Sequence, residues 1–273
     1  GHALMRFSLQ FSVSPHEVRH RIACEQGLTA LGIPYSHHRP KYGEKVACWG
    51  WRTGQKWRRL GFDVLVLERG YIGNRFEWTS LAWNGLNGRG HAPVIDDGGE
   101  RFKANHEPLR PWNPHGRYVL ICGQVPGDAS LQGRDLNPWY EEQSDKYADH
   151  DIVFRPHPLG ARRGAIQELK GAITSNRSLA EDLDDASLVV TYNSNTGVDA
   201  LLAGKPVYCD NEGSMAWGIK PEDREQWAHR LAWRQWTLDE ISSGFALEAL
   251  CNPTPSIAKG APEAMQMASV NNP

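Results

Sequence analysis

The stretch "TYNSNTGVDALLAGKPVYC", residues 191–209, decides the fold of this chain. It continues an apolar run and has the pattern of a strand end, a small polar loop, a helix and a second strand. The loop contains Asn193, Ser194, Asn195 and Thr196. Small polar side chains at the start of a helix either cap its free backbone N–H groups or hold a phosphate there. Both interpretations stay open at this point.

The same alternation of strand and helix runs through the second half of the chain. Apolar runs followed by Gly, Gln or Pro predict strands, and longer polar–apolar runs predict helices. The predicted strands are "RYVLICGQ" (117–124) and "DIVFRPHP" (151–158), and "PWYEEQSDKYADH" (138–150) is the predicted helix between them. This order predicts a parallel sheet covered by helices.

The first half shows the same rhythm. "KVACWGW" (45–51), "RTGQKWRRLG" (52–61) and "DVLVLERG" (63–70) predict a strand, a helix and a strand. An earlier helix is predicted over 15–31, with an apolar stripe of Val18, Ile22, Leu28 and Leu31. The Gly-, Asn- and Trp-rich stretch 70–117 has a looser pattern, and a long irregular stretch of this kind is usually functional.

The predicted fold class is therefore α/β, with two Rossmann-like domains facing a cleft. The Pro-rich segment "PWNPHG" (111–116) is the predicted linker. We expect domains over 5–115 and 116–273, with the C-terminal helix packing back on the first domain. Gly1 and His2 are interpreted as a tag remnant and Met5 as the natural start.

Composition indicates a soluble globular protein, with 273 residues, 40% hydrophobic and 23% charged. The sequence shows neither a run of 18 apolar residues nor a signal-peptide pattern. The five cysteines lack metal-binding spacing, and three of them fall in strand-like runs, which favours buried thiols in a reducing cytosol. We expect a monomer without a membrane partner, in the cytoplasm.

Charge is unevenly distributed along the chain. Residues 1–117 contain 17 Lys/Arg and 10 Asp/Glu, whereas the remainder contains 13 and 22. A basic first half indicates an anionic partner. The alternative is that the two halves simply attract each other.

Polar residues stand where the predicted strands of the second half end. They are Gln124, Arg155, His157 and the loop of Ser194, Asn195 and Thr196, followed by Asp199 on the helix. Arg, His and a helix start suit a diphosphate, and a carboxylate suits the vicinal hydroxyls of a ribose. Each residue alone has a structural explanation, such as capping or loop order, but their joint position predicts a nucleoside diphosphate site. The usual GxGxxG and Walker motifs are absent from the sequence.

"FRPHP" and "TYNSNTGVDALLAGKPV" together resemble the nucleotide-sugar half of GT-B glycosyltransferases, over about residues 117–210. The likeness is to the capsule-polysaccharide type, including Kdo transferases, and to related phage enzymes that glycosylate hydroxymethylated pyrimidines in DNA. The resemblance implies a nucleotide sugar, UDP-sugar favoured, in the second domain and an acceptor in the first. In the family's motif a Glu binds the ribose where this chain has Asp199.

We therefore predict a phage DNA glycosyltransferase acting in the infected bacterial host. Trp78 and Trp83 are candidates for stacking on an extruded base, although each could belong to the core. Asp97, Asp96 and His91 are candidates for the catalytic base, although an Asp-Asp-Gly-Gly run is also a turn signal. We expect neither a metal nor a cofactor, since Arg155, His157 and the helix start could supply the positive field. The alternatives are a capsule or surface-polysaccharide transferase, or a non-catalytic binding module for nucleotide sugars or nucleic acid.

Overall fold

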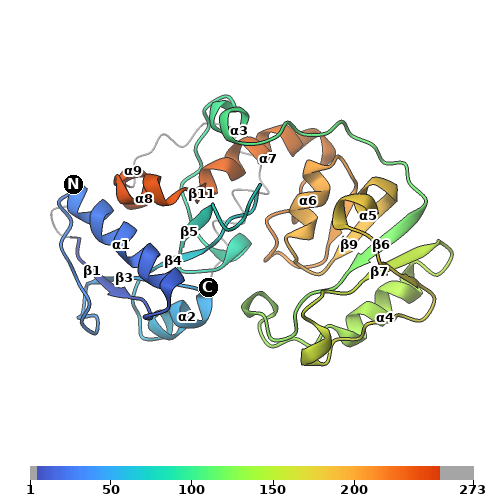
Figure 1. Ribbon diagram of the computed structural model, residues 1–273, viewed down its shortest axis with the longest axis horizontal. Helices are drawn as coiled ribbons and strands as arrows, with labels where there is room; N and C mark the ends of the chain where they lie inside the picture. Colours follow the sequence, from blue (N-terminus) through green and yellow to red (C-terminus); the bar gives the residue numbers. More distant parts are fainter. Residues whose placement is uncertain (1–4, 253–273) are drawn as a thin grey trace. The chain divides into compact units, whose positions relative to one another are not determined.

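The computed structural model describes residues 5–252, which form two compact units (Figure 1). Unit 1 is Gly1–Glu107 with Gln226–Pro273, and unit 2 is Pro108–Glu225. The chain therefore leaves unit 1, builds unit 2 and returns. The segment after residue 225, which the sequence analysis assigned to the second domain apart from its last helix, belongs to unit 1.

Unit 1 contains a six-stranded sheet in the order β11-β5-β4-β3-β1-β2. Four strands are parallel, β5 runs antiparallel to β4, and β11 runs antiparallel to β5. The strands are β1 (Phe7–Gln10), β2 (Tyr35–Ser36), β3 (Lys45–Trp49), β4 (Val64–Arg69), β5 (Thr79–Trp83) and β11 (Gln235–Trp236). The helices are α1 (Pro15–Ala30), α2 (Trp51–Arg59), α3 (Glu100–Asn105), α7 (Arg224–Leu231, which begins in unit 2), α8 (Leu238–Ser242) and α9 (Phe245–Cys251), with 3-10 turns at Asn87–Arg89 and Ala232–Arg234.

The helix predicted over 15–31 is confirmed as α1, but its predicted apolar stripe is partly wrong. The buried face consists of His20, Ala23, Cys24, Gly27 and Leu28, whereas Ile22 is 42% exposed. The physical reason is close helix packing, because a Cβ on Gly27 would lie 2.1 Å from the carbonyl oxygen of Ile241 in α8. Small residues face the C-terminal helices, so the periodicity of large apolar residues located Leu28 correctly but placed Ile22 on the buried face wrongly.

Unit 2 contains an all-parallel sheet in the order β10-β9-β6-β7-β8. In Figure 1, α5 and α6 lie on one face of this sheet and α4 lies on the other, so unit 2 is a three-layer sandwich. Its strands are β6 (Tyr118–Cys122), β7 (Ile152–Arg155), β8 (Ile173–Thr174), β9 (Ala186–Thr191) and β10 (Val207–Cys209). Its helices are α4 (Asn137–Lys146), α5 (Leu179–Asp185) and α6 (Thr196–Leu202), with 3-10 turns at Ala129–Leu131, Ala161–Arg163 and Pro221–Asp223.

The predicted α/β class with two Rossmann-like domains is confirmed. Every strand and helix predicted within residues 45–70 and within residues 117–209 is present. The loosely patterned stretch 70–117 also contains β5 and α3. All five cysteines are buried free thiols. Burial raises the pKa of Cys24, Cys48 and Cys122 to about 12, so these thiols stay protonated and behave as apolar side chains.

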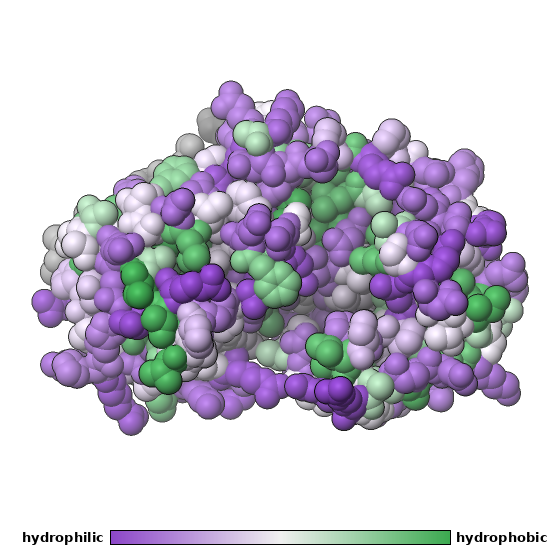
Figure 2. Space-filling model, viewed as in Figure 1, coloured by the Kyte–Doolittle hydropathy of each residue, from purple (hydrophilic) through white to green (hydrophobic). Residues whose placement is uncertain are grey.

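The described part of the surface is largely polar on the face that Figure 2 shows. Hydrophilic residues cover most of that face, and the apolar residues form small separate groups. None of the helices between residues 5 and 252 is long and apolar enough to cross a membrane.

Candidate functional site

The strand order of unit 2 predicts where a ligand binds. The chain runs β6, β7, β8 toward one edge and then returns to add β9 and β10 on the other side of β6. In open parallel sheets, ligands bind at the carboxyl ends of the strands where the order reverses. The reversal lies between β6 and β9, so the loops after Cys122 and Thr191 flank it. The stretch 191–209 therefore begins at this reversal.

Gln124 and Asn193 bridge the two loops that follow β6 and β9. Gln124 Nε2 donates to Asn193 Oδ1 (2.8 Å), and the Asn193 backbone N–H donates to Gln124 Oε1 (3.0 Å). The Tyr140 hydroxyl accepts from the Gln124 backbone N–H (2.8 Å). Both amides are buried, so the Gln124 side chain, predicted as a ligand, holds the loop geometry in this structure. Asn193, which was not among the predicted ligands, is its partner.

Gly123 sets how closely the loops after β6 and β7 approach. Its N–H donates to the Arg155 carbonyl (2.8 Å), and a Cβ on residue 123 would lie 3.0 Å from the backbone nitrogen of His157. Any larger residue would separate these loops or shift their backbones. Gly123 thus permits a close approach between two segments of the protein itself.

The start of α6 is partly capped by the protein. Ser194 Oγ accepts from the Thr196 N–H (3.2 Å), and the Ser194 carbonyl accepts from the Gly197 N–H (3.1 Å). Asn195 is the N-cap residue and Asp199 lies in the first turn, half-buried. These contacts support the capping interpretation of the 194–196 loop, and its role in phosphate binding stays a prediction.

His157 is held in one tautomer. The Leu159 N–H donates to His157 Nδ1 (3.1 Å), which places the proton of the neutral imidazole on Nε2. Burial and the charge of Arg155 lower the pKa of His157 against the opposing influence of Asp128, so the ring is neutral at pH 7. Its Nε2–H has no hydrogen-bond partner among residues 5–252. It is therefore a donor at the end of β7 that a ligand could use.

Arg155 points to the α5 face of the sheet. Its Nη1 donates to the Arg177 carbonyl (2.6 Å) and to Asp182 Oδ2 (3.1 Å). Asp182 is 1% exposed and also accepts from Arg177 and the Ser175 hydroxyl. The Arg155 guanidinium therefore neutralises the buried Asp182 carboxylate, although the Arg155 side chain is 26% exposed. To bind a phosphate as predicted, Arg155 would have to use guanidinium N–H groups other than those of Nη1.

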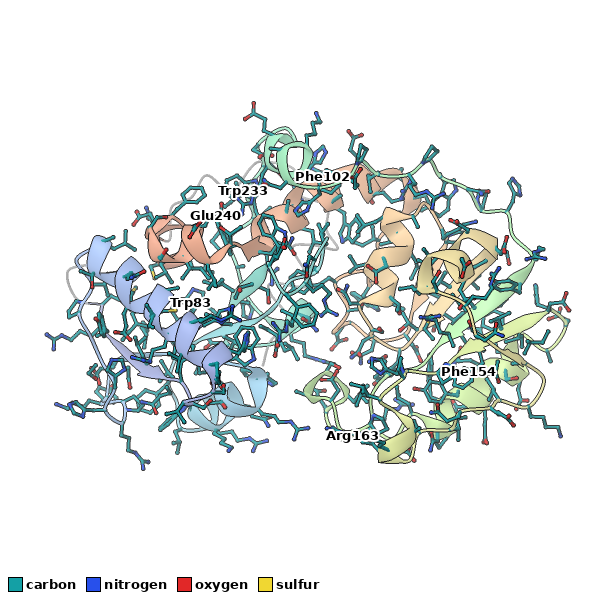
Figure 3. The ribbon with its side chains drawn as sticks, in the orientation of Figure 1. Trp83, Phe102, Phe154, Arg163, Trp233 and Glu240 are labelled. Carbon is teal, nitrogen blue, oxygen red and sulfur yellow. The ribbon has the colours of Figure 1, made fainter. Side chains whose placement is uncertain are left out.

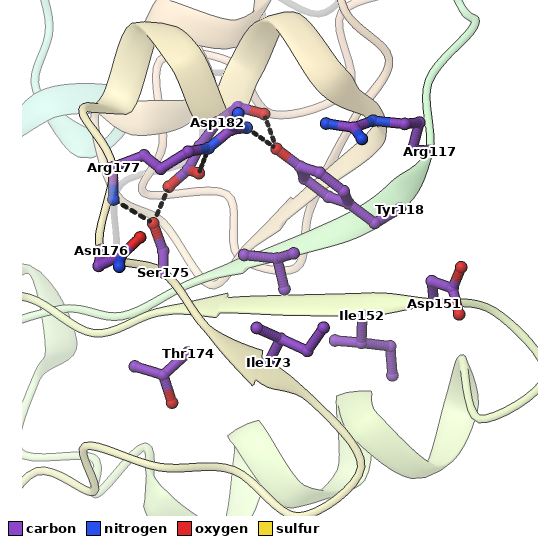
Figure 4. A pocket seen from close by; sticks show the side chains of 11 residues that line it. Arg117, Tyr118, Asp151, Ile152, Ile173, Thr174, Ser175, Asn176, Arg177 and Asp182 are labelled. Carbon is purple, nitrogen blue, oxygen red and sulfur yellow. Dashed lines mark hydrogen bonds and ion pairs between the residues drawn. The ribbon is translucent and has the colours of Figure 1, made fainter.

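A pocket of about 490 Å³ lies near this ion pair (Figure 4). Residues 117–118, 151–153 and 173–177 line it, together with Asp182. Figure 4 shows Arg177 bonded to Asp182 and to the Tyr118 hydroxyl (2.7 Å). The pocket thus lies at the starts of β6 and β7, and the Gln124, His157 and Ser194 loops are not part of it.

In unit 1 the predicted base Asp96 forms an ion pair. Arg230 donates from Nε and Nη2 to the two carboxylate oxygens of Asp96, each at 2.7 Å, and Arg230 is 1% exposed. A bidentate pair with a buried arginine gives Asp96 a structural partner.

Asp97 caps helix α3. Its carboxylate accepts from the Gly99 and Arg101 N–H groups, both at 2.8 Å. Burial raises the pKa of Asp97, but the hydrogen bonds from the Arg101 and Gly99 N–H groups outweigh burial and leave that pKa below its ordinary value. The contacts match the turn interpretation of the Asp-Asp-Gly-Gly run, and a low pKa makes a carboxylate a weak base.

His91 and Trp83 lie together at one edge of the unit 1 sheet. They form an isolated β-bridge, and Trp83 pairs with Leu65 near the start of β4. This is the amino edge of the parallel strands. The Trp83 indole N–H donates to the Leu250 carbonyl (2.8 Å), and its ring packs on Phe7. Burial and the charges of Arg234 and Arg58 lower the pKa of His91.

Trp78 lies at the opposite edge, before β5. Its ring contacts His106, and the Arg101 guanidinium lies 5.7 Å from its centroid. Arg101 pairs with Glu240 at 2.7 Å and stacks on Trp233 and Trp236. Figure 3 labels Phe102, Trp233 and Glu240 around this region. The structure therefore brings Trp78 near α3, and does not bring it together with Trp83.

No metal site is formed by the residues between 5 and 252, where no group of three or more His, Cys, Asp or Glu side chains could hold an ion.

Comparisons with known proteins support the fold. No protein-family model matches the chain, and no curated protein sequence matches it. Among solved structures, the chain is similar to the β-Kdo 2,7-transferase of KpsC from Thermosulfurimonas dismutans, with 16% identity and a TM-score of 0.55, over 89% of this chain and 99% of that one. It is also similar to the β-Kdo 2,4-transferase of the same KpsC, with 16% identity and a TM-score of 0.53, over 84% of this chain and 91% of that one. These similarities confirm the predicted GT-B-like fold.

Proposed function

We propose that the chain is a glycosyltransferase whose unit 2 binds a nucleotide-sugar donor, UDP-sugar favoured, without a metal ion. The observation that carries the proposal is the convergence of loops after β6, β7 and β9 at the strand-order reversal. There His157 offers a free N–H donor, and the 194–199 segment offers polar groups to a diphosphate and a ribose.

The proposed acceptor is the hydroxyl of a hydroxymethylpyrimidine in phage DNA, bound by unit 1. Charge supports this choice, because unit 1 contains 18 Lys/Arg and 14 Asp/Glu, whereas unit 2 contains 12 and 18. A net charge of +4 on unit 1 favours a polyanion and −6 on unit 2 does not. The transfer needs a base for the acceptor hydroxyl, and Asp97, Asp96 and His91 remain the proposed candidates.

The second candidate acceptor is a surface saccharide. It is favoured by the two similar structures, whose names describe Kdo transfer. The two candidates share the donor half of the reaction and differ only in the acceptor.

Calorimetry with UDP, GDP and CMP tests the donor half. We expect binding of at least one nucleotide, and Arg155→Ala should weaken it by about 1.5–3 kcal/mol, the scale of a charged hydrogen bond. Arg177→Ala is the matched control, because it also removes a cation from Asp182. Equal affinity losses in both variants would mean that the effect comes through Asp182. Absence of binding by any of the three nucleotides at millimolar concentration would overturn the donor proposal.

A further inference from the structure

The unit 1 sheet has a strand-order reversal of its own. β1 lies between β2 and β3, and all three strands are parallel. The chain adds β2 on one side of β1 and then β3 and β4 on the other. The carboxyl ends of β1 and β3 therefore flank the position in the strand order at which open sheets bind ligands. Residues that follow these strands are the first place to look for an acceptor contact.

An aromatic platform stands at this edge. Trp49 ends β3, and the rings of His16 and His20 from α1 pack on it, with centroids at 4.1 Å and 4.6 Å. His20 is fixed by hydrogen bonds to the His16 carbonyl (2.8 Å) and to Thr79 Oγ1 (2.9 Å). Two α1 histidines, one of them fixed by Thr79 of β5, thus pack on the Trp49 ring.

Arg69, the last residue of β4, lies on this platform with Glu68 as an anionic neighbour but without an ion pair among residues 5–252. Its guanidinium carbon is 5.4 Å from the centroid of Trp49 and 4.4 Å from that of Phe76. Within residues 5–252 it makes no ion pair and no side-chain hydrogen bond. By contrast, the buried or half-buried Arg101, Arg177 and Arg230 each pair with a carboxylate.

The surroundings of Arg69 favour an anion. Arg19 and Arg75 are close enough to lower the pKa of Arg69, in addition to burial, while Glu68 acts in the opposite direction. Phe76 is 76% exposed, although the guanidinium lies over its ring. A half-buried arginine held by rings retains its fork of N–H donors for a phosphate. An exposed ring beside it suits a nucleic-acid base.

We propose that Arg69 and Phe76 form a nucleic-acid contact at the carboxyl edge of the unit 1 sheet. Arg69 binds oxygens of one phosphodiester, and Phe76 stacks on an adjacent unpaired base. Arg19 and Arg75 add attraction to the flanking phosphates. This assignment rests on the proposed role of unit 1 as the acceptor-binding part, and it replaces Trp83, whose indole is engaged with Leu250, as the stacking residue.

Fluorescence anisotropy with a labelled DNA oligonucleotide carrying a single-stranded bulge tests the contact, without any donor present. We expect Arg69→Gln to weaken binding tenfold or more and to reduce the salt slope by about 1 between about 50 and 200 mM salt. Arg59→Gln is the matched control, because Arg59 is an exposed arginine of the same unit at the far end of α2, and it should change affinity by less than about twofold. Phe76→Ala should weaken binding to the bulged DNA more than to a fully paired duplex.

The outcomes separate this assignment from the proposed function. Equal losses in Arg69→Gln and Arg59→Gln, or no DNA binding by the unaltered chain, would overturn the contact. Arg69-dependent binding of an acidic saccharide in place of DNA would also overturn it. Calorimetry with UDP on the same variants reports the donor half independently, and Arg69→Gln should leave it unchanged. If Arg69→Gln fails to fold, Phe76→Ala still decides, because Phe76 is exposed.

Discussion

Asp96→Ala should lower the free energy of unfolding of the protein, and not only its rate of sugar transfer. The substitution leaves the Arg230 guanidinium, which is 1% exposed, without its bidentate partner. Removing one partner of a buried ion pair costs about 3–5 kcal/mol. Because the Asp96 side chain is 22% exposed, water can enter the vacated space, and we expect a value of about 3 kcal/mol. Urea unfolding followed by tryptophan fluorescence measures this difference.

Two control variants sharpen that experiment. Asp184→Ala removes the partner of Arg110 in an exposed ion pair and should cost no more than about 0.5 kcal/mol. Asp96→Leu combined with Arg230→Met should recover most of the lost stability, since an apolar pair can replace a buried ion pair. If Asp96→Ala unfolds at the same urea concentration as the unaltered chain while turnover disappears, the structural explanation is wrong and Asp96 is the base.

Three further predictions concern ligand binding, packing and pH. Asp199→Asn should reduce nucleotide affinity in calorimetry while leaving the melting temperature unchanged; a lower melting temperature without selective loss of affinity would point to the helix dipole instead. Gly123→Ala should lower the free energy of unfolding in urea by about 1–3 kcal/mol, because the new Cβ would lie 3.0 Å from the backbone nitrogen of His157. Unchanged stability would refute that close approach. Burial lowers the pKa of His20 to about 4 from 6.5, so the unfolded chain binds the proton first as pH falls. The free energy of unfolding should therefore decrease below pH 6.5, by up to about 1.4 kcal/mol per pH unit, and His20→Gln should flatten that slope in urea unfolding measured between pH 6.5 and 5.

The sequence predicted the elements with strong local signals and missed those without them. β4 (Val64–Arg69) and β9 (Ala186–Thr191) are continuous apolar strands, and both were predicted. β2 and β11 contain two residues each, which is too short for any periodicity to register. β5 (Thr79–Trp83) lies within a Gly- and Asn-rich stretch whose composition indicated a loop. Strand pairing with distant segments overrode these local preferences.

The candidate site shows the same division. The sequence predicted which site residues lie at strand ends. The prolines of "RPHP" and the polar loop after an apolar run mark those ends locally. The ion-pair partners of these residues could not be predicted, because they are distant along the chain. Asp96 and Arg230 are 134 residues apart, and Arg155 and Asp182 are 27 apart. Arg69 was missed because nothing in a single sequence distinguishes an arginine without a carboxylate partner from one that has it.

Mass spectrometry of DNA containing hydroxymethylcytosine or hydroxymethyluracil, incubated with the chain and a panel of nucleotide sugars, decides whether this protein glycosylates modified DNA. We expect one modified base to gain the mass of one sugar from at least one donor, most readily where that base is mismatched and easily extruded. Transfer to a free saccharide with unmodified DNA would assign the protein to the saccharide acceptor. No transfer to either acceptor from any donor would refute the proposed glycosyltransferase activity.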